Sequence, residues 1–212
     1  MTLFDAASEI GKAPIPIGML AAYFNRGQAP KYSNEDGLIV LNQKCVRNGR
    51  VSVDPARKTE AAHVHVERRL VAGDVLVNST GVGTLGRVGI WSHDFSATVD
   101  SHITIVRINP TIAPPIIGAF AMLSSQPIIE AMGEGSTGQT ELSRAKLGRV
   151  EIDLPSGNHE VLARKLTVLE AKSDDALRES RTLAALRDTL LPQLMSGNLC
   201  VRNAERIAED AL

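Results

Sequence analysis

A seven-residue repeat of apolar residues organises the last third of the chain. Between residues 156 and 194, leucines and one alanine recur at this spacing, and three further leucines widen the line into a stripe: Leu162, Leu169, Ala176, Leu183 and Leu190, then Leu166, Leu186 and Leu194. Charged residues of both signs lie between them. The pattern predicts a long helix that pairs with another helix. At about 1.5 Å rise per residue it would be on the order of 55 Å long, so we expect much of it to project.

Polar residues interrupt this stripe and leave an alternative open. Lys172 or Ser173, and then Glu179 or Ser180, stand where a core leucine would be expected. Polar residues in such a seam lower stability but fix register and partner number, which favours pairing. The alternative is a long helix packed back on its own domain. The residues expected to pair are Leu162, Leu166, Leu169, Ala176, Leu183, Leu186 and Leu190.

Short apolar runs separated by turn residues fill residues 1–155. The segment 103–108 alternates apolar and polar residues and is the clearest predicted strand. Further strands are expected at 38–41, 51–53, 75–77, 88–91, 97–99 and 150–154, and helical segments at 116–124, with a possible extension to 132, and within 141–147. Asn48-Gly49 is a hairpin turn signal. Short strands interspersed with short helices predict an α+β fold, with a mixed α/β domain over 1–155 and a helical part over 156–212.

The composition is that of an ordinary water-soluble protein, with 43% hydrophobic and 22% charged residues. No window holds eighteen apolar residues, so no membrane span is expected. The first residues lack the basic start and apolar run of a signal peptide, which predicts a cytoplasmic protein. Cys45 and Cys200 lie far apart in the sequence and are expected to be reduced thiols.

Charge and aromatic content limit the classes of nucleic-acid binding that the chain can perform. The formal net charge is −1, whereas nucleic-acid binders usually carry bulk positive charge. Aromatic residues make up only 3% of the chain, which argues against single-strand binding by base stacking. One local basic segment, residues 42–58, carries a single acid, Asp54, among five bases: Lys44, Arg47, Arg50, Arg57 and Lys58.

The glycine-rich segment 78–87 contains the spacing G-x-G-x-x-G at Gly81, Gly83 and Gly86. The dinucleotide-binding fingerprint needs a following helix, but residues 88–91 are predicted to form a strand. Two interpretations remain open: a tight turn that needs positive φ, or a loop that presents polar side chains to a polymer such as DNA. An enzyme that uses this loop would need detectable nucleotide binding.

The segment 63–67 reads His-Val-His-Val-Glu, which would place two imidazoles and a carboxylate on one face of a strand. Zinc could use that spacing, but no further ligand is positioned by sequence and Arg68-Arg69 disfavour a cation, so an exposed strand face is expected. Cys45 lies between two bases that could lower its pKa, without a nearby histidine. His102 is expected to have a structural, hydrogen-bonding role. We therefore predict no metal, no cofactor and no catalytic site.

Five stretches, taken in order, resemble the specificity (S) subunit of type I restriction–modification systems. Residues 27–32 resemble its G-x-x-P-K-Y opening, and residues 41–49 resemble the I-x-Q-x-N-I-x-x-G segment that follows. The remaining matches are 73–81 to G-D-I-L-x-x-S-x-G, 138–142 with 150–155 to L-x-x-I-x-I-P-L-P, and 190–199 to L-L-P-K-L-x-S-G-E-I.

This resemblance implies a non-catalytic subunit that reads double-stranded DNA for methyltransferase (M) and restriction (R) subunits. An S subunit has two target-recognition domains and two long helices, whereas this chain has one of each, so it resembles a half-size form. Residues 1–155 would be the recognition domain. A homodimer formed through the long helix would restore two recognition domains and read a bipartite site. The S-adenosylmethionine site would lie on the M subunits.

The residues expected to contact DNA lie in four polar loops. Asn and Gln pair with adenine, and Arg and Lys with guanine, in the major groove. The expected contacts are Arg26, Gln28, Lys31, Tyr32, Asn42, Gln43, Lys44, Arg47, Asn48, Arg50, Ser79, Thr80, Thr84, Arg87, Gln139 and Thr140. The alternative function is a coiled-coil assembly or adaptor protein with a protein-binding globular domain. A steep salt dependence of DNA binding would separate the two.

Overall fold

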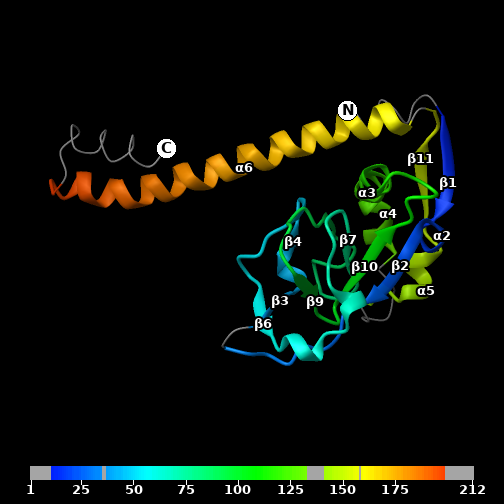
Figure 1. The fold of residues 1–212 in the computed structure, drawn as a ribbon, viewed down its shortest axis with the longest axis horizontal. Helices are drawn as coiled ribbons and strands as arrows, with labels where there is room; N and C mark the ends of the chain where they lie inside the picture. The colour runs from blue at the N-terminus through cyan, green and yellow to red at the C-terminus, as the bar shows by residue number, and fades with distance from the viewer. Residues whose placement is uncertain (1–10, 35–36, 133–140, 158, 199–212) are drawn as a thin grey trace. The chain divides into compact units, whose positions relative to one another are not determined.

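The computed structural model describes residues 11–34, 37–132, 141–157 and 159–198. Its contacts divide the chain into two units, Met1–Leu166 and Thr167–Leu212 (Figure 1). The first unit is a mixed α/β structure, as the sequence predicts, and it contains three sheets. The second unit is described as far as Asn198 and consists mainly of the remainder of the long C-terminal helix.

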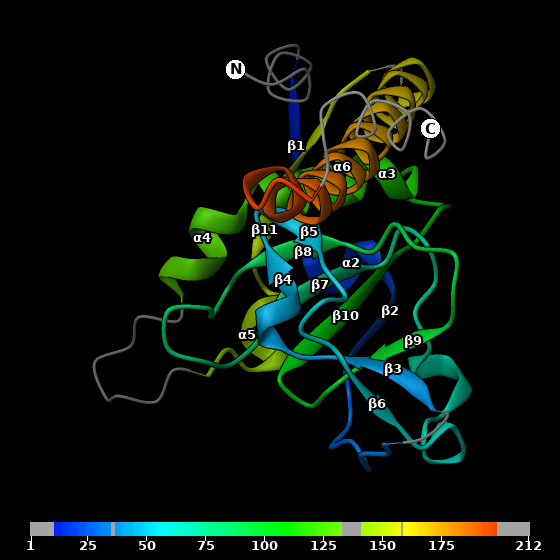
Figure 2. The same ribbon diagram turned by 90° about the vertical axis from the view of Figure 1, so that its left-hand side faces the viewer.

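The largest sheet has six strands in the order β2-β10-β7-β8-β5-β4. Its strands are β2 (Ala21–Arg26), β4 (Val46–Arg47), β5 (Gly49–Val51), β7 (Val75–Asn78), β8 (Val88–Ile90) and β10 (Ile103–Ile108). A three-stranded sheet has the order β6-β3-β9, and a two-stranded sheet pairs β1 with β11. These strands are β1 (Lys12–Pro16), β3 (Leu38–Leu41), β6 (Arg57–Thr59), β9 (Ala97–Val99) and β11 (Glu151–Pro155). Figure 2 shows β3, β6 and β9 grouped together.

Two apolar cores lie on opposite faces of the central strands, because successive side chains of a strand point to opposite sides. Along β7, Val75 and Val77 belong to one core, while Leu76 belongs to the other. Along β10, Ile105 and Val106 divide between the cores in the same way. Both central strands are therefore buried on two faces, which explains their nearly continuous apolar sequences.

The helices that the structure describes before α6 are short. They are α2 (Ile17–Leu20), α3 (Pro115–Ser124), α4 (Gln126–Ala131) and α5 (Arg144–Gly148), with 3-10 turns η1 (Gln43–Cys45), η2 (Ala61–His63) and η3 (Val66–Arg68). The predicted helix at 116–124 is confirmed, and its extension forms a separate helix, α4. The break lies at Ser125, where Pro127 follows and has no N–H to continue the hydrogen-bond ladder.

The prediction of a strand face over residues 63–67 is wrong. The segment forms parts of η2 and η3, in which each backbone N–H donates to the carbonyl three residues earlier, as in His63 to Glu60 and Arg68 to His65. Val64 is buried between the two turns, while His63 and His65 are exposed. The alternation of apolar and polar residues does not mark a strand face here, because Val64 is buried whereas Val66 is 78% exposed.

Helix α6 (His159–Met195) is 37 residues long, or about 55 Å, which confirms the predicted long helix. Its first turns belong to the first unit, because Leu162 and Leu166 are buried in the same core as α3 and β11. From Leu169 onward, α6 keeps several leucines exposed. Among the described residues, no helix is long and apolar enough to cross a membrane.

Candidate nucleic-acid interface

The sheet topology brings together loops that are far apart in the sequence. Strands β2 and β7 both run antiparallel to β10, with Arg26 opposite Thr104 and Asn78 opposite Ile103. The chain therefore leaves β2 and β7 at the end where β10 begins. Strands β3 and β9 are parallel and end beside each other, and the Asp100 N–H donates to the Leu41 carbonyl at 2.9 Å. We call residues 26–28, 42–45, 78–87 and 100–102 the polar loop cluster.

A chain of hydrogen bonds connects three loops of this cluster. The Asn78 side-chain amide donates to the Gln43 carbonyl at 3.0 Å. The Gln43 amide in turn donates to the Thr80 hydroxyl at 2.7 Å and to the Thr80 carbonyl at 3.0 Å. The Thr80 hydroxyl is 2.8 Å from His102 Nδ1, which confirms the hydrogen-bonding role expected for His102. These bonds make a frame that holds the cluster in one arrangement.

Two of the predicted DNA contacts, Arg26 and Ser79, are engaged within the fold. Arg26 forms an ion pair with Glu141 at 2.6 Å and donates to the Leu142 carbonyl at 2.8 Å. The Ser79 hydroxyl is buried and lies 2.5 Å from the Thr104 hydroxyl. The two Arg26 bonds attach the segment that begins at Glu141 to the polar loop cluster. Gln139 and Thr140, which precede it, lie outside the described residues.

The glycine-rich segment forms a compact turn in which Gly81, Gly83 and Gly86 all have positive φ. This is the turn interpretation of the G-x-G-x-x-G spacing, and strand β8 follows directly, so the dinucleotide fingerprint is not formed. A Cβ at Gly86 would stand 2.6 Å from the Glu130 Cα, so only glycine allows the turn to approach α4 this closely. Arg87 donates to the Gly83 carbonyl at 2.8 Å and closes the turn.

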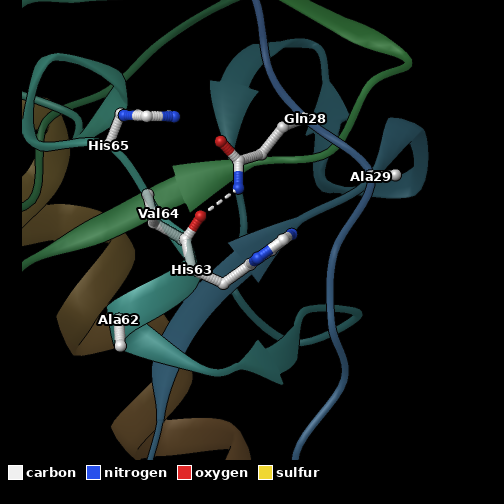
Figure 3. Close-up of a pocket in the computed structure, with 6 residues that line it drawn as sticks. All are labelled: Gln28, Ala29, Ala62, His63, Val64 and His65. Carbon is white, nitrogen blue, oxygen red and sulfur yellow. Dashed lines mark hydrogen bonds between the residues drawn. The ribbon is translucent and has the colours of Figure 1, made fainter.

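Gln28 is occupied in the same way. Its amide N–H donates to the His63 carbonyl, and its Oε1 accepts from Arg68 at 2.9 Å. Figure 3 shows the shallow pocket beside it, lined by Gln28, Ala29, Ala62, His63, Val64 and His65. The part of the chain that the structure describes contains no group of three residues able to hold a metal ion. The two histidines remain exposed side chains at the pocket edge.

The basic segment forms a cap, a turn and a hairpin. Asn42 caps η1 by accepting from the Lys44 N–H at 2.9 Å, and its amide donates to the Pro55 carbonyl at 2.8 Å. Asn48 and Gly49 both have positive φ, which a type I′ turn requires, so the predicted hairpin is confirmed. Because β5 runs parallel to β8, this turn lies on the same side as the glycine-rich turn that precedes β8.

Lys44 and Arg47 differ from the other predicted contacts. Both side chains are exposed, and neither has a side-chain hydrogen bond or ion pair to any residue in the described ranges. Asn48 is also exposed at the hairpin turn, while Arg50 and Thr84 are half-buried. The candidate contacts therefore divide into residues that hydrogen-bond to one another within the fold and a few exposed polar side chains beside them.

A second group of cations surrounds Tyr32. The Arg57 guanidinium lies 3.5 Å from the centre of the exposed Tyr32 ring, which is a cation–π contact. Lys31 forms an exposed ion pair with Glu60 at 3.0 Å, and Lys58 is exposed on the same strand as Arg57. Arg57 was recognisable in the sequence only as part of the basic segment, because its partner lies 25 positions earlier.

Burial changes two acid–base groups under the cluster. Cys45 is fully buried, and burial raises the pKa of its thiol, so the lowering that its basic neighbours could have caused is not found. The nearby carboxylates of Asp100 and Asp54 raise this pKa further, against the opposing effect of the Asn42 backbone N–H. Burial also raises the pKa of the Asp100 carboxyl, against the opposing effect of the His102 backbone N–H, which donates to it at 2.9 Å.

No family model and no curated protein matches this chain in sequence. Among solved structures, the S subunit of a type I restriction–modification system from M. genitalium superimposes with a TM-score of 0.64 at 17% identity, over 88% of this chain and 46% of that one. The HsdS subunit from Thermoanaerobacter tengcongensis gives 0.55 at 13% identity, over 92% and 50%. A chain from a type I R-M system, solved for its complex assembly and conformational transition, gives 0.54 at 16% identity, over 88% and 48%.

The fold implied by the sequence resemblance is confirmed by these superpositions. The chain spans about half the length of each solved relative. This chain therefore has the fold of type I restriction–modification S subunits, over roughly half of their length.

Proposed function

We propose that the chain is a non-catalytic DNA-recognition subunit of a type I restriction–modification system. The observation that supports this most directly is the polar loop cluster, in which four sequence-distant segments meet and leave unpaired cations beside a hydrogen-bonded frame. The S-subunit fold supports the same function. The chain is not an enzyme in this proposal, and it carries no cofactor of its own.

The frame and the exposed residues have different tasks in DNA recognition. Gln43, Asn78 and Thr80 bond to one another and fix the loop geometry. Lys44 and Arg47 are long, exposed and unpaired among the described residues, so they can reach guanine O6 and N7 in the major groove. A fixed frame keeps the conformational entropy lost on binding small, because only the contacting side chains must become ordered.

The Tyr32 group supplies contacts to the phosphate backbone. The exposed Arg57 guanidinium is held over the Tyr32 ring, and Lys58 adds a second exposed charge. Phosphate contacts position a protein on the duplex without reading sequence. The formal net charge of −1 means that this local positive charge, and not the whole chain, attracts DNA.

Helix α6 pairs two copies of the chain in this proposal. Leu162 and Leu166 are buried within one copy, so the pairing stripe begins at Leu169 and continues through Ala176, Leu183, Leu186 and Leu190. A two-fold dimer would restore the two recognition domains of a full-length S subunit and read a bipartite site. M subunits would dock on this dimer and bring the methyl donor, and R subunits would join them for cleavage.

The test begins with selection of duplexes from a random DNA library by the full chain, followed by binding measured against salt concentration. A specific site whose affinity falls steeply with salt is expected. Arg47→Ala should weaken that site by about 1–3 kcal/mol and relax specificity at one base pair. If Lys44 contacts phosphate instead, Lys44→Ala should lower the slope of log affinity against log salt concentration by about 1. It should then weaken binding to all sequences equally.

Arg149→Ala is the matched control, because Arg149 is exposed and lies at the end of α5, away from the polar loop cluster. Loss of affinity equal to that of Arg47→Ala would show that only general charge matters. If no duplex is enriched and the weak binding is independent of salt, the chain is instead a coiled-coil adaptor whose globular domain binds protein.

A further inference from the structure

Val82 stands at the tip of the glycine-rich turn with 87% of its surface exposed. It is the most exposed of the large apolar side chains in the described part of the chain. Its neighbours, Gly81 and Gly83, have φ of 107° and 72°, so the backbone bends sharply on both sides of it. An isolated exposed apolar residue is ordinary on a protein surface. This one is unusual in where it stands and how it is held.

The turn that carries Val82 is fixed from several directions. The Leu85 N–H donates to the Gly81 carbonyl at 3.0 Å, and the Gly86 N–H donates to the Asn78 carbonyl at 2.8 Å. The Arg87 guanidinium closes the opposite side of the turn. Leu85 packs against the apolar core and so holds the turn against the domain. The turn lies below α4 in Figure 2, and Gly86 approaches Glu130 of that helix.

Val82 lies near the candidate DNA contacts, and this position indicates the class of ligand that its exposed side chain would contact. Two residues before it, Thr80 is bonded to Gln43. The hairpin that bears Arg47 and Asn48 lies at the same end of the sheet as the glycine-rich turn. Val82 therefore lies at the same end of the sheet as these polar groups. Val82 has no hydrogen-bonding side chain, so it can recognise only an apolar feature. The β-branched side chain has few rotamers, so little freedom is lost on contact.

In the major groove the apolar feature of a base pair is the C5-methyl group of thymine. 5-Methylcytosine carries the same group at the same place. We propose that Val82 contacts the C5-methyl group of a pyrimidine in the recognised site and thereby contributes to the discrimination of that base. This inference rests on the proposed function, because it adds a specificity-determining residue to the same DNA-reading surface.

The test uses the full chain and its selected duplex. Each thymine is replaced in turn by deoxyuridine, which removes only the methyl group, and each cytosine by 5-methylcytosine, which adds one. Removing the contacted methyl should weaken wild-type binding about fourfold, since burying one such group contributes about this much. Val82→Ala should bind the thymine site about fourfold more weakly and should not distinguish thymine from deoxyuridine there.

Val71→Ala is the matched control. Val71 is a 53% exposed valine at the opposite end of β7 from the glycine-rich turn, so its loss should leave thymine discrimination unchanged. Val82 is exposed, so both variants should retain the wild-type melting temperature. A response of the wild-type chain to 5-methylcytosine but not to deoxyuridine, absent in Val82→Ala, would identify methylated cytosine as the source of the contacted group.

Two outcomes overturn the inference, and they differ. If the wild-type chain selects a specific site but Val82→Ala reads every thymine and cytosine substitution as the wild type does, the Val82 contact is refuted and the DNA-recognition function stands. If the wild-type chain selects no site at all, the function itself fails and the Val82 contact fails with it.

Discussion

Leu166 and Leu183 lie on the same helix but should respond to truncation in different ways. Leu166 is 3% exposed in the core of the first unit, so Leu166→Ala leaves a cavity and should lower the free energy of unfolding by about 2–5 kcal/mol. Leu183 is 53% exposed in the single chain, so Leu183→Ala should hardly change that free energy. The contrast tests which part of the heptad stripe serves the fold and which part is left for pairing.

The magnitude for pairing follows from the surface that Leu183 leaves uncovered. Full burial of a leucine contributes about 1.5–3 kcal/mol, and about half of the Leu183 side chain remains to be buried in the single chain. This amounts to about 1 kcal/mol per copy and about 2 kcal/mol for the two copies in a two-fold dimer. Leu183→Ala should therefore raise the dimer dissociation constant about 30-fold.

Sedimentation over a concentration series measures the dissociation constant, and urea unfolding measures the stability of the first unit. The double variant Leu169→Asp with Leu183→Asp should be monomeric at all accessible concentrations, by light scattering. Arg181→Ala is the control, since residue 181 is exposed and lies two positions away, about 200° around the helix. A wild-type chain that stays monomeric, or a Leu183→Ala dimer as tight as the wild type, would refute helix pairing.

Three further predictions concern groups beneath the loops. Asp74 is 1% exposed and accepts hydrogen bonds from Arg107 on both oxygens at 2.8 Å. Because Arg107 is 30% exposed, Asp74→Ala should lower the free energy of unfolding in urea by about 3 kcal/mol, the lower end of the range for a broken buried pair. Burial raises the pKa of Asp100 in the folded chain. The contribution of Asp100 to stability is therefore greatest below the ordinary carboxyl pKa and falls as pH rises through the raised pKa. Asp100→Asn should remove this decline and stabilise the chain at pH 7, and an unchanged profile of stability against pH would contradict this prediction. Because burial raises the pKa of the Cys45 thiol, iodoacetamide at pH 8 should leave it unmodified until urea unfolds the chain, measured by mass spectrometry in a Cys200→Ser background.

The sequence by itself determined the features that depend on local repetition. A heptad pattern predicted the bounds of α6 to within a few residues at each end. Helix geometry repeats about every 3.6 residues, so an apolar face appears in the sequence as a regular spacing. Asn48-Gly49 marked the hairpin because positive φ at both central residues is a local steric requirement. The strand β10 was visible because isoleucine and valine dominate it, although it is buried on both faces and shows no alternation of burial.

Only the tertiary structure decided which residues of these patterns contact one another. Leu162 and Leu183 occupy equivalent heptad positions, yet one is buried in the first unit and the other is exposed, because only the first turns of α6 meet a core. Arg26 and Arg47 are both arginines in polar loops, but Arg26 has a carboxylate partner 115 positions away, which no local pattern reveals. The 63–67 segment was misassigned because five alternating residues do not specify their backbone hydrogen-bond partners. Those partners, like the meeting of four loops around Gln43 and Thr80, are set by strand order, which short-range sequence does not encode.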